Sequence, residues 1–459
     1  MRKSILLLPA AAVLSGCSLI PALDPVASPV SSRFPGKTGG DLPADIAWQK
    51  FFADPRLKKI VATALENNRD LRIAALNVEQ ARAQYGISRS DLFPHLNANS
   101  SLNRHMSLGN ESSGGSLAIR SETDDIRVGF TSYELDLFGR VRALNKADLQ
   151  HYFASDAARL SAQISLVSQI ATQYLTERAA QEQLALSTQT LDGMNVGYGI
   201  MKQRFDAGTV SGVELSSMDV QRQTAIADLA AFRQRIAELN NSLAFLAGAA
   251  LPSGLPSGRR LDQVIVADVR AGVPSDLLVR RPDIREAEYE LRAANANIGA
   301  ARAAFFPTIS LTANGGRASR SLDGLFSGGT SVWLFSPQIH VPIYAGGEGK
   351  AYVELTQVRK KIEIAQYERS IQSAFREVAD SLAARRGLDE RIAATEKLVA
   401  AQQKRTDLAT ARYNEGVDSY FEVLTATLDL YSARQSLIQL RLSRAIASVN
   451  LYKALGGGW

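Results

Sequence analysis

The chain has 459 residues, of which 46% are hydrophobic and 21% charged, and a formal net charge of +6 at pH 7. This composition is typical of a folded protein, and the length suffices for two or three domains or one elongated assembly unit. Basic and acidic residues alternate along helical stretches without a basic and aromatic cluster, which favours a solvated surface over a nucleic-acid-binding patch. The single cysteine, Cys17, excludes an internal disulfide and a cysteine-based zinc site.

The N-terminus has the pattern of a lipoprotein signal. Arg2 and Lys3 precede an apolar stretch, and the sequence LSGC, which ends at Cys17, resembles a bacterial lipobox. We therefore expect residues 1–16 to be a signal peptide and Cys17 to carry covalent lipid; the alternative is an ordinary signal peptide with an incidental cysteine. Ser18 follows instead of the Asp that commonly favours inner-membrane retention in enterobacterial lipoproteins, which points to the outer membrane. No later apolar run reaches the roughly 18 residues of a membrane helix, so any span must consist of strands.

An internal repeat organises the rest of the chain. Residues 70–94 match residues 283–307 at a constant offset of 213, and residues 204–208 match residues 412–416 at an offset of 208. The sequence thus divides into an N-terminal tail, two similar repeats and a linker rich in proline and glycine. The predicted bounds are 17–54 for the tail, 55–251 for the first repeat, 252–275 for the linker and 276–459 for the second repeat.

The sequence patterns of the two repeats predict the same order of helices and strands. A helix ends at a Phe-Pro pair, because proline disfavours helix in the residue before it. Two extended segments follow, separated by a loop rich in glycine and serine. The predicted helices are 55–91 and 276–304, the predicted strands are 96–102, 126–138, 308–314 and 332–344, and the predicted loops are 107–122 and 315–330.

In the remainder of each repeat, the sequence pattern predicts a long helical hairpin. Apolar residues recur at alternating spacings of three and four, which is typical of a coiled-coil seam. The first helix of each hairpin can run about 65 residues, or roughly 100 Å. Gly208 and Gly416 mark the reversals. Gly193, Gly197 and Gly199 are expected to bend or interrupt the first of these helices.

Four strands per chain are too few to close a transmembrane barrel, and open strand edges are not tolerated in lipid. Two chains would supply eight strands and a filled interior, whereas three would supply twelve and a lumen; we favour three. The strand alternation changes parity between Phe130 and Leu135, which predicts a bulge. Pro337 and Pro342 are expected to interrupt the last strand. Six aromatic residues are expected either to form interfacial girdles or to pack internally: Phe130, Tyr133, Phe138, Trp333, Phe335 and Tyr344.

These motifs together resemble the TolC-like outer membrane factors, in particular the NodT/OprM branch of efflux lipoproteins, over nearly the whole mature chain. The motifs are Trp48 with 51–55 (FFADP), 65–71 (LENNRDL), 135–142 (LDLFGRVR), 274–285 (PSDLLVRRPDIR), 298–311 (IGAARAAFFPTISL) and 452–459 (YKALGGGW). The resemblance implies an α+β membrane protein: a homotrimeric twelve-stranded β-barrel continued by a twelve-helix coiled-coil α-barrel. It also implies an equatorial domain built partly from both ends of the chain.

The resemblance further implies the outer-membrane channel of a tripartite efflux pump. Such a channel is a passive exit duct for drugs or other small toxic compounds, anchored by lipid in the outer membrane with its tunnel in the periplasm. A periplasmic adaptor protein and an inner-membrane RND transporter would open it. No cofactor is implied besides lipid on Cys17, and no metal or nucleic acid. The alternative is a type I secretion channel for polypeptides, against which the lipobox and the branch motifs argue.

Function in this family is expected at the periplasmic tip of the tunnel. Glu422 matches the first acidic position of the family's gate, Thr425 stands at the second, and Phe421 is a candidate hydrophobic constriction. Alternatively, Glu422 is a solvated helix residue that pairs with a neighbouring chain. The two hairpin turns are the candidate adaptor contacts: Gly208, Thr209 and Val210 in the first, and Gly416, Val417, Asp418 and Ser419 in the second.

Other classes of protein fit the sequence poorly. The four histidines (His95, His105, His151 and His340) are scattered without metal-ligand spacing. Residues 345–350 only faintly resemble a phosphate-binding loop, since Ala351 stands in place of the required Ser or Thr. We therefore expect no enzyme. A coiled-coil adaptor or structural lipoprotein would explain the hairpins but not two strand pairs joined by Gly/Ser loops.

Overall fold

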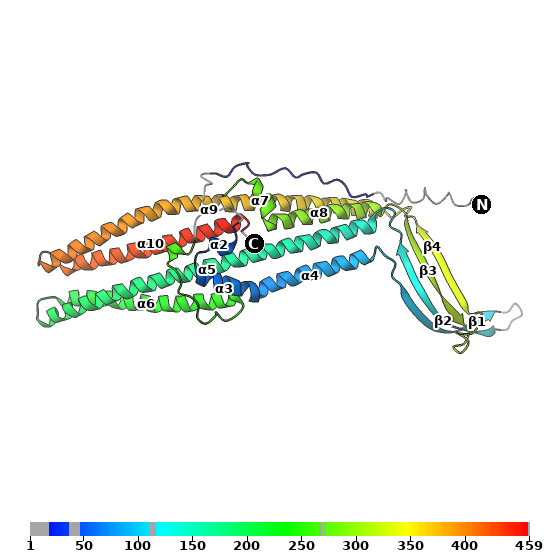
Figure 1. Ribbon diagram of the computed structural model, residues 1–459, viewed down its shortest axis with the longest axis horizontal. Coiled ribbons are helices and arrows are strands. Elements are labelled where there is room, and N and C mark those ends of the chain that lie inside the picture. The colour runs from blue at the N-terminus through cyan, green and yellow to red at the C-terminus, as the bar shows by residue number, and fades with distance from the viewer. Residues whose placement is uncertain (1–17, 36–45, 111–115, 266–268, 270, 458–459) are drawn as a thin grey trace. The chain divides into compact units, whose positions relative to one another are not determined.

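The computed structural model describes residues 18–35, 46–110, 116–265, 269 and 271–457. The predicted signal peptide and Cys17 lie outside the described residues. The helices and strands, labelled in Figure 1, divide between two units. The first unit combines the N-terminal residues up to Ala27 with residues 77–156 and 286–367, and the second combines residues 28–76, 157–285 and 368–459. None of the described helices is both long and apolar enough to cross a membrane.

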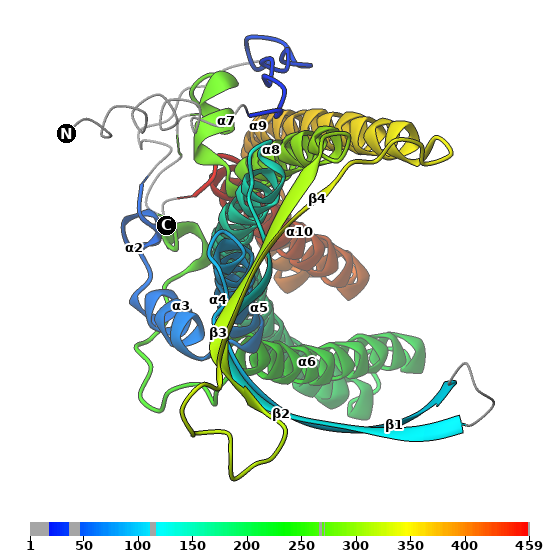
Figure 2. The same ribbon diagram turned by 90° about the vertical axis from the view of Figure 1, so that its right-hand side faces the viewer.

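The first unit contains one antiparallel sheet in which each repeat supplies two strands. The strands are β1 (Asn97–Asn110), β2 (Ser116–Glu134), β3 (Thr308–Ser319) and β4 (Ser331–His340). Their order in the sheet is β1-β2-β3-β4, so the two hairpins of the sequence repeat meet at the β2–β3 pair. The sheet curves strongly between its edge strands β1 and β4 (Figure 2).

The predicted bulge is present in β2. Phe130 lies opposite Ala313, but the next paired residue of β2 is Tyr133, opposite Leu311. Between them, Ser132 has a φ of 55°, and its amide donates to the Thr312 hydroxyl over 3.0 Å. One extra residue on β2 explains why its apolar side chains change parity along the strand.

Three strand predictions are wrong. The predicted loop 315–330 begins later than expected, because β3 runs on to Ser319. Residues 107–122, expected to be a loop, are largely paired, because the β1–β2 ladder continues from Asn97 opposite Gly129 to Asn110 opposite Ser116. A partner strand satisfies the backbone of these small polar residues, although their composition indicates a loop. Pro337 does not interrupt β4 but lies within it, opposite Leu311. Within one chain β4 is the last strand of the sheet and pairs with β3 alone, a position in which proline occurs, whereas Pro342 lies beyond its end.

The long helices confirm the predicted hairpins. The first helices, α5 (Arg140–Asp206) and α9 (Glu348–Asn414), each have 67 residues, and α6 (Gly212–Ala247) and α10 (Tyr420–Ala454) return along them. The expected interruption of α5 at its three glycines is wrong, since the helix is continuous. At Gly197 the lack of a side chain allows two other side chains to pack close to the α5 backbone. A Cβ there would lie 2.5 Å from Met218 Cε and 2.7 Å from the Tyr420 hydroxyl.

The helix that opens each repeat is divided in two. The pieces are α3 (Pro55–Asn67) and α4 (Arg69–Ser90) in the first repeat, and α7 (Ser275–Arg280) and α8 (Pro282–Ala303) in the second. The backbone of Asn68 is extended. Its side-chain Nδ2 donates to Leu246 O over 2.8 Å, and its side-chain Oδ1 accepts from Leu71 N over 2.9 Å. Arg281 is extended because Pro282 follows it.

The second unit packs the segment just before the first repeat against the last helix, α10. Phe51, in the short helix α2 (Trp48–Phe51), stacks on Tyr452 with ring centroids 4.3 Å apart. The Tyr452 hydroxyl donates to Ile46 O over 2.9 Å. The linker contributes a 3₁₀ turn, Leu261–Gln263, in which Leu261 is buried. Burial of these aromatic rings stabilises the packing of α2 against α10.

We expect Gly248→Ala to reduce the free energy of unfolding by more than about 2 kcal/mol. Gly248 ends α6 with a φ of 67°, and an added Cβ would lie 2.3 Å from the carbonyl oxygen of Asn67. Urea unfolding in detergent, followed by circular dichroism, measures the loss. Gly254→Ala is the matched control, because Gly254 has a φ of 74° but no neighbour within 4 Å. Its expected loss is about 1 kcal/mol from backbone strain alone, and equal losses at both sites would contradict the steric explanation.

Candidate functional site

The sheet of the first unit has one apolar and one polar face. Residues directly opposite each other on neighbouring strands share a face, and the register therefore places Val128 with Gly315 and Trp333. We call this the apolar face; its exposed large side chains are Leu102, Met106, Ile126, Val128, Trp333, Phe335 and Ile339. The polar face carries Asn97, Asn99, Ser101, Asn103, Arg127, Thr312, Ser336 and Gln338.

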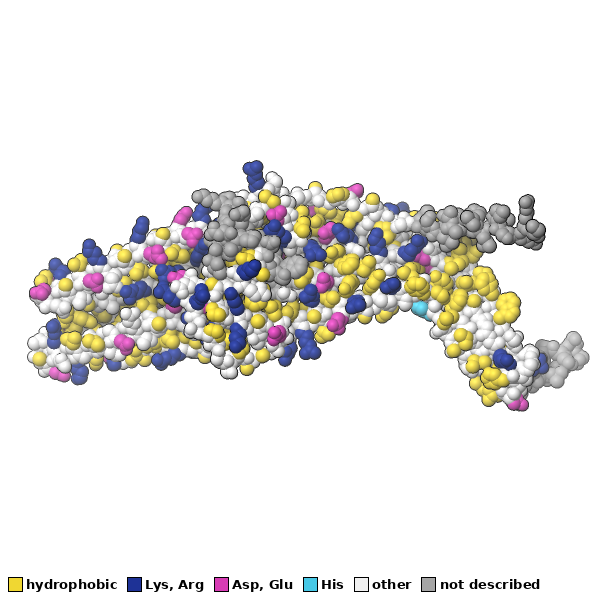
Figure 3. Space-filling view, in the orientation of Figure 1, with side chains coloured by type: hydrophobic (Ala, Val, Ile, Leu, Met, Phe, Trp, Pro, Cys, Tyr) yellow, Lys and Arg dark blue, Asp and Glu magenta, His cyan; other side chains and the backbone are white. Residues whose placement is uncertain are grey.

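Charged residues on the apolar face lie toward the β1–β2 turn. There Arg104 pairs with Asp124 through two contacts, of which Nη2–Oδ2 measures 3.0 Å. In Figure 3 the visible surface of the sheet is mainly hydrophobic or neutral, whereas Lys, Arg, Asp and Glu are scattered over the helices. An exposed apolar surface of this extent is typical of a membrane or protein interface.

The predicted aromatic girdle is divided between the two expected roles. Phe138 stacks on Phe306 with centroids 4.6 Å apart, and the Tyr133 hydroxyl donates to Leu92 O over 3.0 Å, so both pack internally. Trp333 and Phe335 are 80% and 59% exposed on the apolar face. Tyr344, beyond the end of β4, is 89% exposed, whereas Phe130 is half-buried with its ring centroid 6.2 Å from that of Tyr133. Three of the six residues are thus exposed as a girdle at a lipid–water interface requires.

The tips of the two helical hairpins lie side by side in the second unit (Figure 1). Both reverse in the same way, because Gly208 and Gly416 each have a φ of 73°. Thr209 N donates to Arg204 O and Val417 N to Arg412 O, each over 2.9 Å, which closes a Schellman motif at the end of each long helix. The turn residues are exposed apart from Val210 and Asp418, which are half-buried.

The two tips differ in the role of their equivalent glutamates. In the first tip, Ser211 N donates to Glu214 Oε2 over 2.8 Å and Glu214 N donates to Ser211 Oγ over 3.2 Å, a complete capping box. In the second, the side chain of Ser419 forms no cap hydrogen bond. Glu422 is exposed, and within the described ranges its carboxylate has no ion-pair partner. Glu214 thus stabilises a helix end, whereas Glu422 is available for another role.

Phe421 and Thr425 flank Glu422 on the first two turns of α10. Phe421 is 64% exposed, so in the single chain its ring has little packing against the rest of the tip. The Thr425 hydroxyl donates to Phe421 O over 2.8 Å, which leaves its methyl group and Phe421 on neighbouring positions of one helix face. The three predicted gate residues are therefore adjacent, near the second tip.

A set of aromatic and basic side chains joins the two hairpins near their tips. The Arg204 guanidinium of α5 donates to the Tyr413 hydroxyl of α9 and lies 5.0 Å from its ring centroid. Tyr413 contacts Tyr420 edge to face with ring centroids 5.2 Å apart, and the Tyr420 hydroxyl lies against Gly197 of the first hairpin. Sequence analysis missed this set, although the repeat alignment places an aromatic residue after an arginine at both 204–205 and 412–413.

The second tip is also tied internally by an ion pair. Arg412 Nε lies 2.5 Å from Asp418 Oδ2, and Nη2 lies 2.9 Å from Oδ1. The hydrogen bond from Arg412 lowers the pKa of the Asp418 carboxyl. This pair spans the predicted adaptor turn, and therefore stabilises its shape.

We expect the Arg412–Asp418 pair to make the second tip sensitive to acid. A lowered pKa means that the stabilisation is present above the ordinary aspartate pKa of about 3.9 and is lost as the pH falls through the folded-state value. The protection factor of the Val417 amide should thus be constant from neutral pH to about pH 5 and fall below about pH 4. Hydrogen exchange corrected for intrinsic rates measures it. Asp418→Asn should be less protected throughout and show no step; a step retained in this variant would assign the transition to another group.

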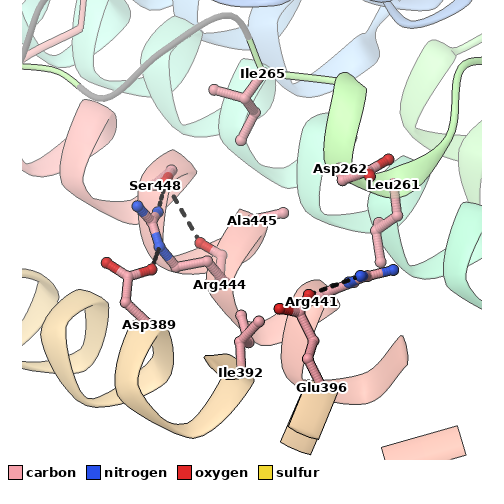
Figure 4. A pocket seen from close by; sticks show the side chains of 10 residues that line it. All are labelled: Leu261, Asp262, Ile265, Asp389, Ile392, Glu396, Arg441, Arg444, Ala445 and Ser448. Carbon is pink, nitrogen blue, oxygen red and sulfur yellow. Dashed lines mark hydrogen bonds and ion pairs between the residues drawn. The ribbon is translucent and has the colours of Figure 1, made fainter. Parts of the chain in front are cut away.

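A separate cavity of about 410 Å³ lies between the linker turn, α9 and α10 (Figure 4). Four of its charged side chains form two ion pairs: Arg441 Nη2 lies 2.9 Å from Glu396 Oε1, and Arg444 Nε lies 2.6 Å from Asp389 Oδ1. The fifth, Asp262, pairs with Arg260 of the linker, 3.5 Å from Nε to Oδ1. The two ion pairs of the cavity therefore connect α9 to α10 within the second hairpin. Among the described residues, no cluster of three or more His, Cys, Asp or Glu is placed to hold a metal ion.

Comparison with known proteins agrees with this arrangement. The family described as outer membrane efflux protein matches residues 60–249 and 273–457. The toluene efflux pump outer membrane protein TtgC of Pseudomonas putida is 44% identical over 467 residues, which cover 100% of this chain and 96% of TtgC. The probable outer membrane lipoprotein SilC of Salmonella typhimurium is 37% identical over 456 residues, which cover 97% of each protein.

A solved structure extends the likeness to the fold. The open-state crystal structure of the MtrE outer membrane channel of Neisseria gonorrhoeae superposes with a TM-score of 0.90 at 40% identity. The alignment covers 96% of this chain and 98% of MtrE. The predicted fold class, the role as an outer-membrane efflux channel and the outer-membrane location are confirmed. The chain belongs to the outer membrane efflux protein family and is an outer-membrane channel component of an efflux pump.

Proposed function

We propose that three copies of this chain close their sheets into one twelve-stranded barrel. The observation that carries this proposal is the sheet with one apolar and one polar face and, in the described part of the chain, with β1 and β4 paired on one side only. Open edges are not tolerated in lipid, so each β4 edge would pair with the β1 edge of the next copy. Twelve strands leave a lumen lined by the polar face.

The trimer would act as a passive exit duct for drugs or other small toxic compounds. A periplasmic adaptor would dock on the two hairpin turns, 208–210 and 416–419, and an inner-membrane RND transporter would supply the cargo. Support comes from the exposure of both turns and from the relatives, one of which is named for toluene efflux. Lipid on Cys17 would anchor the N-terminus in the outer membrane.

In this proposal, Glu422 and Phe421 form the periplasmic gate. Their exposure in one protomer and the lack of a capping role for Glu422 support this assignment. Opening requires the tips to separate, so contacts such as Arg204–Tyr413 and Tyr420–Gly197 would have to rearrange with them. A ring of three carboxylates would favour cations over anions at the narrowest point.

Single-channel recording of the full-length protein in planar bilayers tests the duct and the gate together. We expect ion-conducting pores, and we expect Glu422→Ala to change cation preference or conductance about twofold or more. Glu415→Ala is the matched control, since it removes an exposed carboxylate from the same tip outside the gate. Absence of pores would refute the duct, and equal effects of both variants would leave Glu422 without a gate role.

Photo-crosslinking in the native host tests the partners. A photoreactive residue at Val210 or Ser419 should capture an adaptor that works with an RND transporter, whereas one at Leu398, exposed on α9 16 residues before its end at Asn414, should capture less. Captured proteins are identified by mass spectrometry. An adaptor of an ABC transporter would instead favour the polypeptide-export alternative.

A further inference from the structure

An open groove of about 820 Å³ lies in the first unit, between the N-terminal segment and the start of α9. One wall is Leu19 with Arg302, Phe305 and Phe306, and the other is one face of α9 from Lys350 to Lys361. We call it the Leu19 groove. The α9 wall spans about 16 Å. None of its lining residues belongs to the hairpin tips or to the polar face of the sheet.

The N-terminal segment is held firmly beside this groove. Ile20 packs on the buried alanines Ala147, Ala293 and Ala296. A Cβ added at Gly299 would lie 2.5 Å from Ile20 Cγ1 and 2.9 Å from Ile20 N, so the segment crosses α8 where only glycine fits. Asn295 Nδ2 donates to Pro21 O over 2.8 Å. Ser18, next to the predicted lipid attachment at Cys17, is thereby positioned near the groove.

The lining of the groove combines apolar and cationic side chains. Phe305 is 53% exposed, and its ring lies against the start of α9, where it would be 3.1 Å from a Cβ added at Gly349. Phe305 therefore closes the end of the groove that is nearest to Gly349. Val353 and Val358 continue the apolar lining. Arg302, Lys350 and Lys361 face a single acid, Glu354, and Lys350 and Lys361 have no ion-pair partner in the described part of the chain.

The groove is also continuous with the apolar face of the sheet. Phe306 immediately precedes Pro307 and β3, and Phe138, which precedes α5, stacks on it. If the apolar face contacts lipid, the groove lies at the level where acyl chains give way to headgroups. Aromatic and basic side chains concentrate at that level, and basic side chains there bind anionic headgroups.

We propose that the Leu19 groove binds an anionic phospholipid, with its phosphate held by the cations of the groove and an acyl chain along Phe305 and Val353. This inference rests on the proposed placement of the sheet in the outer membrane. The occupant is a membrane lipid and not the lipid attached to Cys17, because three largely unopposed cations select a phosphate group, which a thioether-linked diacylglycerol lacks.

Native mass spectrometry of the full-length protein, purified in detergent, tests the proposal with phosphatidylglycerol and phosphatidylcholine of identical chains. We expect phosphatidylglycerol to bind at least about tenfold more tightly. Lys350→Gln/Lys361→Gln should weaken its binding about tenfold or more, and Val353→Trp should weaken it by filling the groove. The control Lys397→Gln/Lys404→Gln removes two exposed lysines from the same helix and should change binding less than about twofold.

Three outcomes would overturn the proposal: no preference between the lipids, equal losses in both lysine pairs, or a gain of about tenfold in Cys17→Ala. The last would mean that the attached lipid normally occupies the groove. Bilayer recordings of the same samples separate this inference from the proposed function. Pores without selective lipid binding would refute the groove alone, whereas absence of pores would refute the duct whatever the lipid result.

Discussion

Asp54→Ala should reduce the free energy of unfolding of the second unit by about 3–5 kcal/mol. Asp54 is fully buried, and it caps α3 by accepting from Arg56 N over 2.8 Å. It also accepts from the Tyr174 hydroxyl over 2.7 Å and from Arg259 N over 2.8 Å. Alanine would remove the cap and leave two donors without a partner. Urea unfolding in detergent, followed by circular dichroism, measures the change.

A double-mutant cycle with Tyr174→Phe provides the control for this prediction. Burial and the bond to Asp54 raise the pKa of the Tyr174 hydroxyl, so it donates at all working pH values. Tyr174→Phe alone should cost about 1 kcal/mol, and the double variant should cost less than the sum of the single losses, because the broken bond is shared. A loss below about 0.5 kcal/mol in Asp54→Ala would mean that this junction does not stabilise the unit.

Phe335→Arg should prevent stable insertion of the sheet, at a cost of about 2–4 kcal/mol per chain for a charge that faces lipid. Phe335 lies on the apolar face opposite Ala313 and is 59% exposed in the single chain. Refolding into lipid vesicles, measured as the fraction of protein that becomes resistant to protease, reports the effect.

The neighbouring residue supplies a control in the same strand. Ser336 lies opposite Thr312 on the polar face, so Ser336→Arg adds the same charge toward the proposed lumen and should cost less than about 1 kcal/mol. If both variants inserted equally well, the apolar face would not contact lipid. If only Ser336→Arg failed, the two faces would be assigned the wrong way round.

The sequence alone predicted the elements that depend on local rules. The spacing of apolar residues predicted the two long helices, and glycine at 208 and 416 predicted their ends, because a left-handed residue costs least at glycine. The parity change after Phe130 predicted the bulge in β2, since side chains alternate strictly along a strand. The repeat and the family motifs predicted the family and the fold.

Long-range contacts decided the remaining features. The ladder between β1 and β2 extends both strands into residues whose composition predicts a loop. Each strand supplies hydrogen-bond partners for the backbone amides and carbonyls of the other. Asn68 ends a helix through its bond to Leu246 O, which is distant in sequence. Glu214 and Glu422 are equivalent in the repeat, yet only Glu214 joins a capping box. Sequence periodicity specifies on which face of a helix or strand a residue lies. Only tertiary structure shows which of two equivalent glutamates forms a cap hydrogen bond, as Glu214 does, and which remains exposed, as Glu422 does.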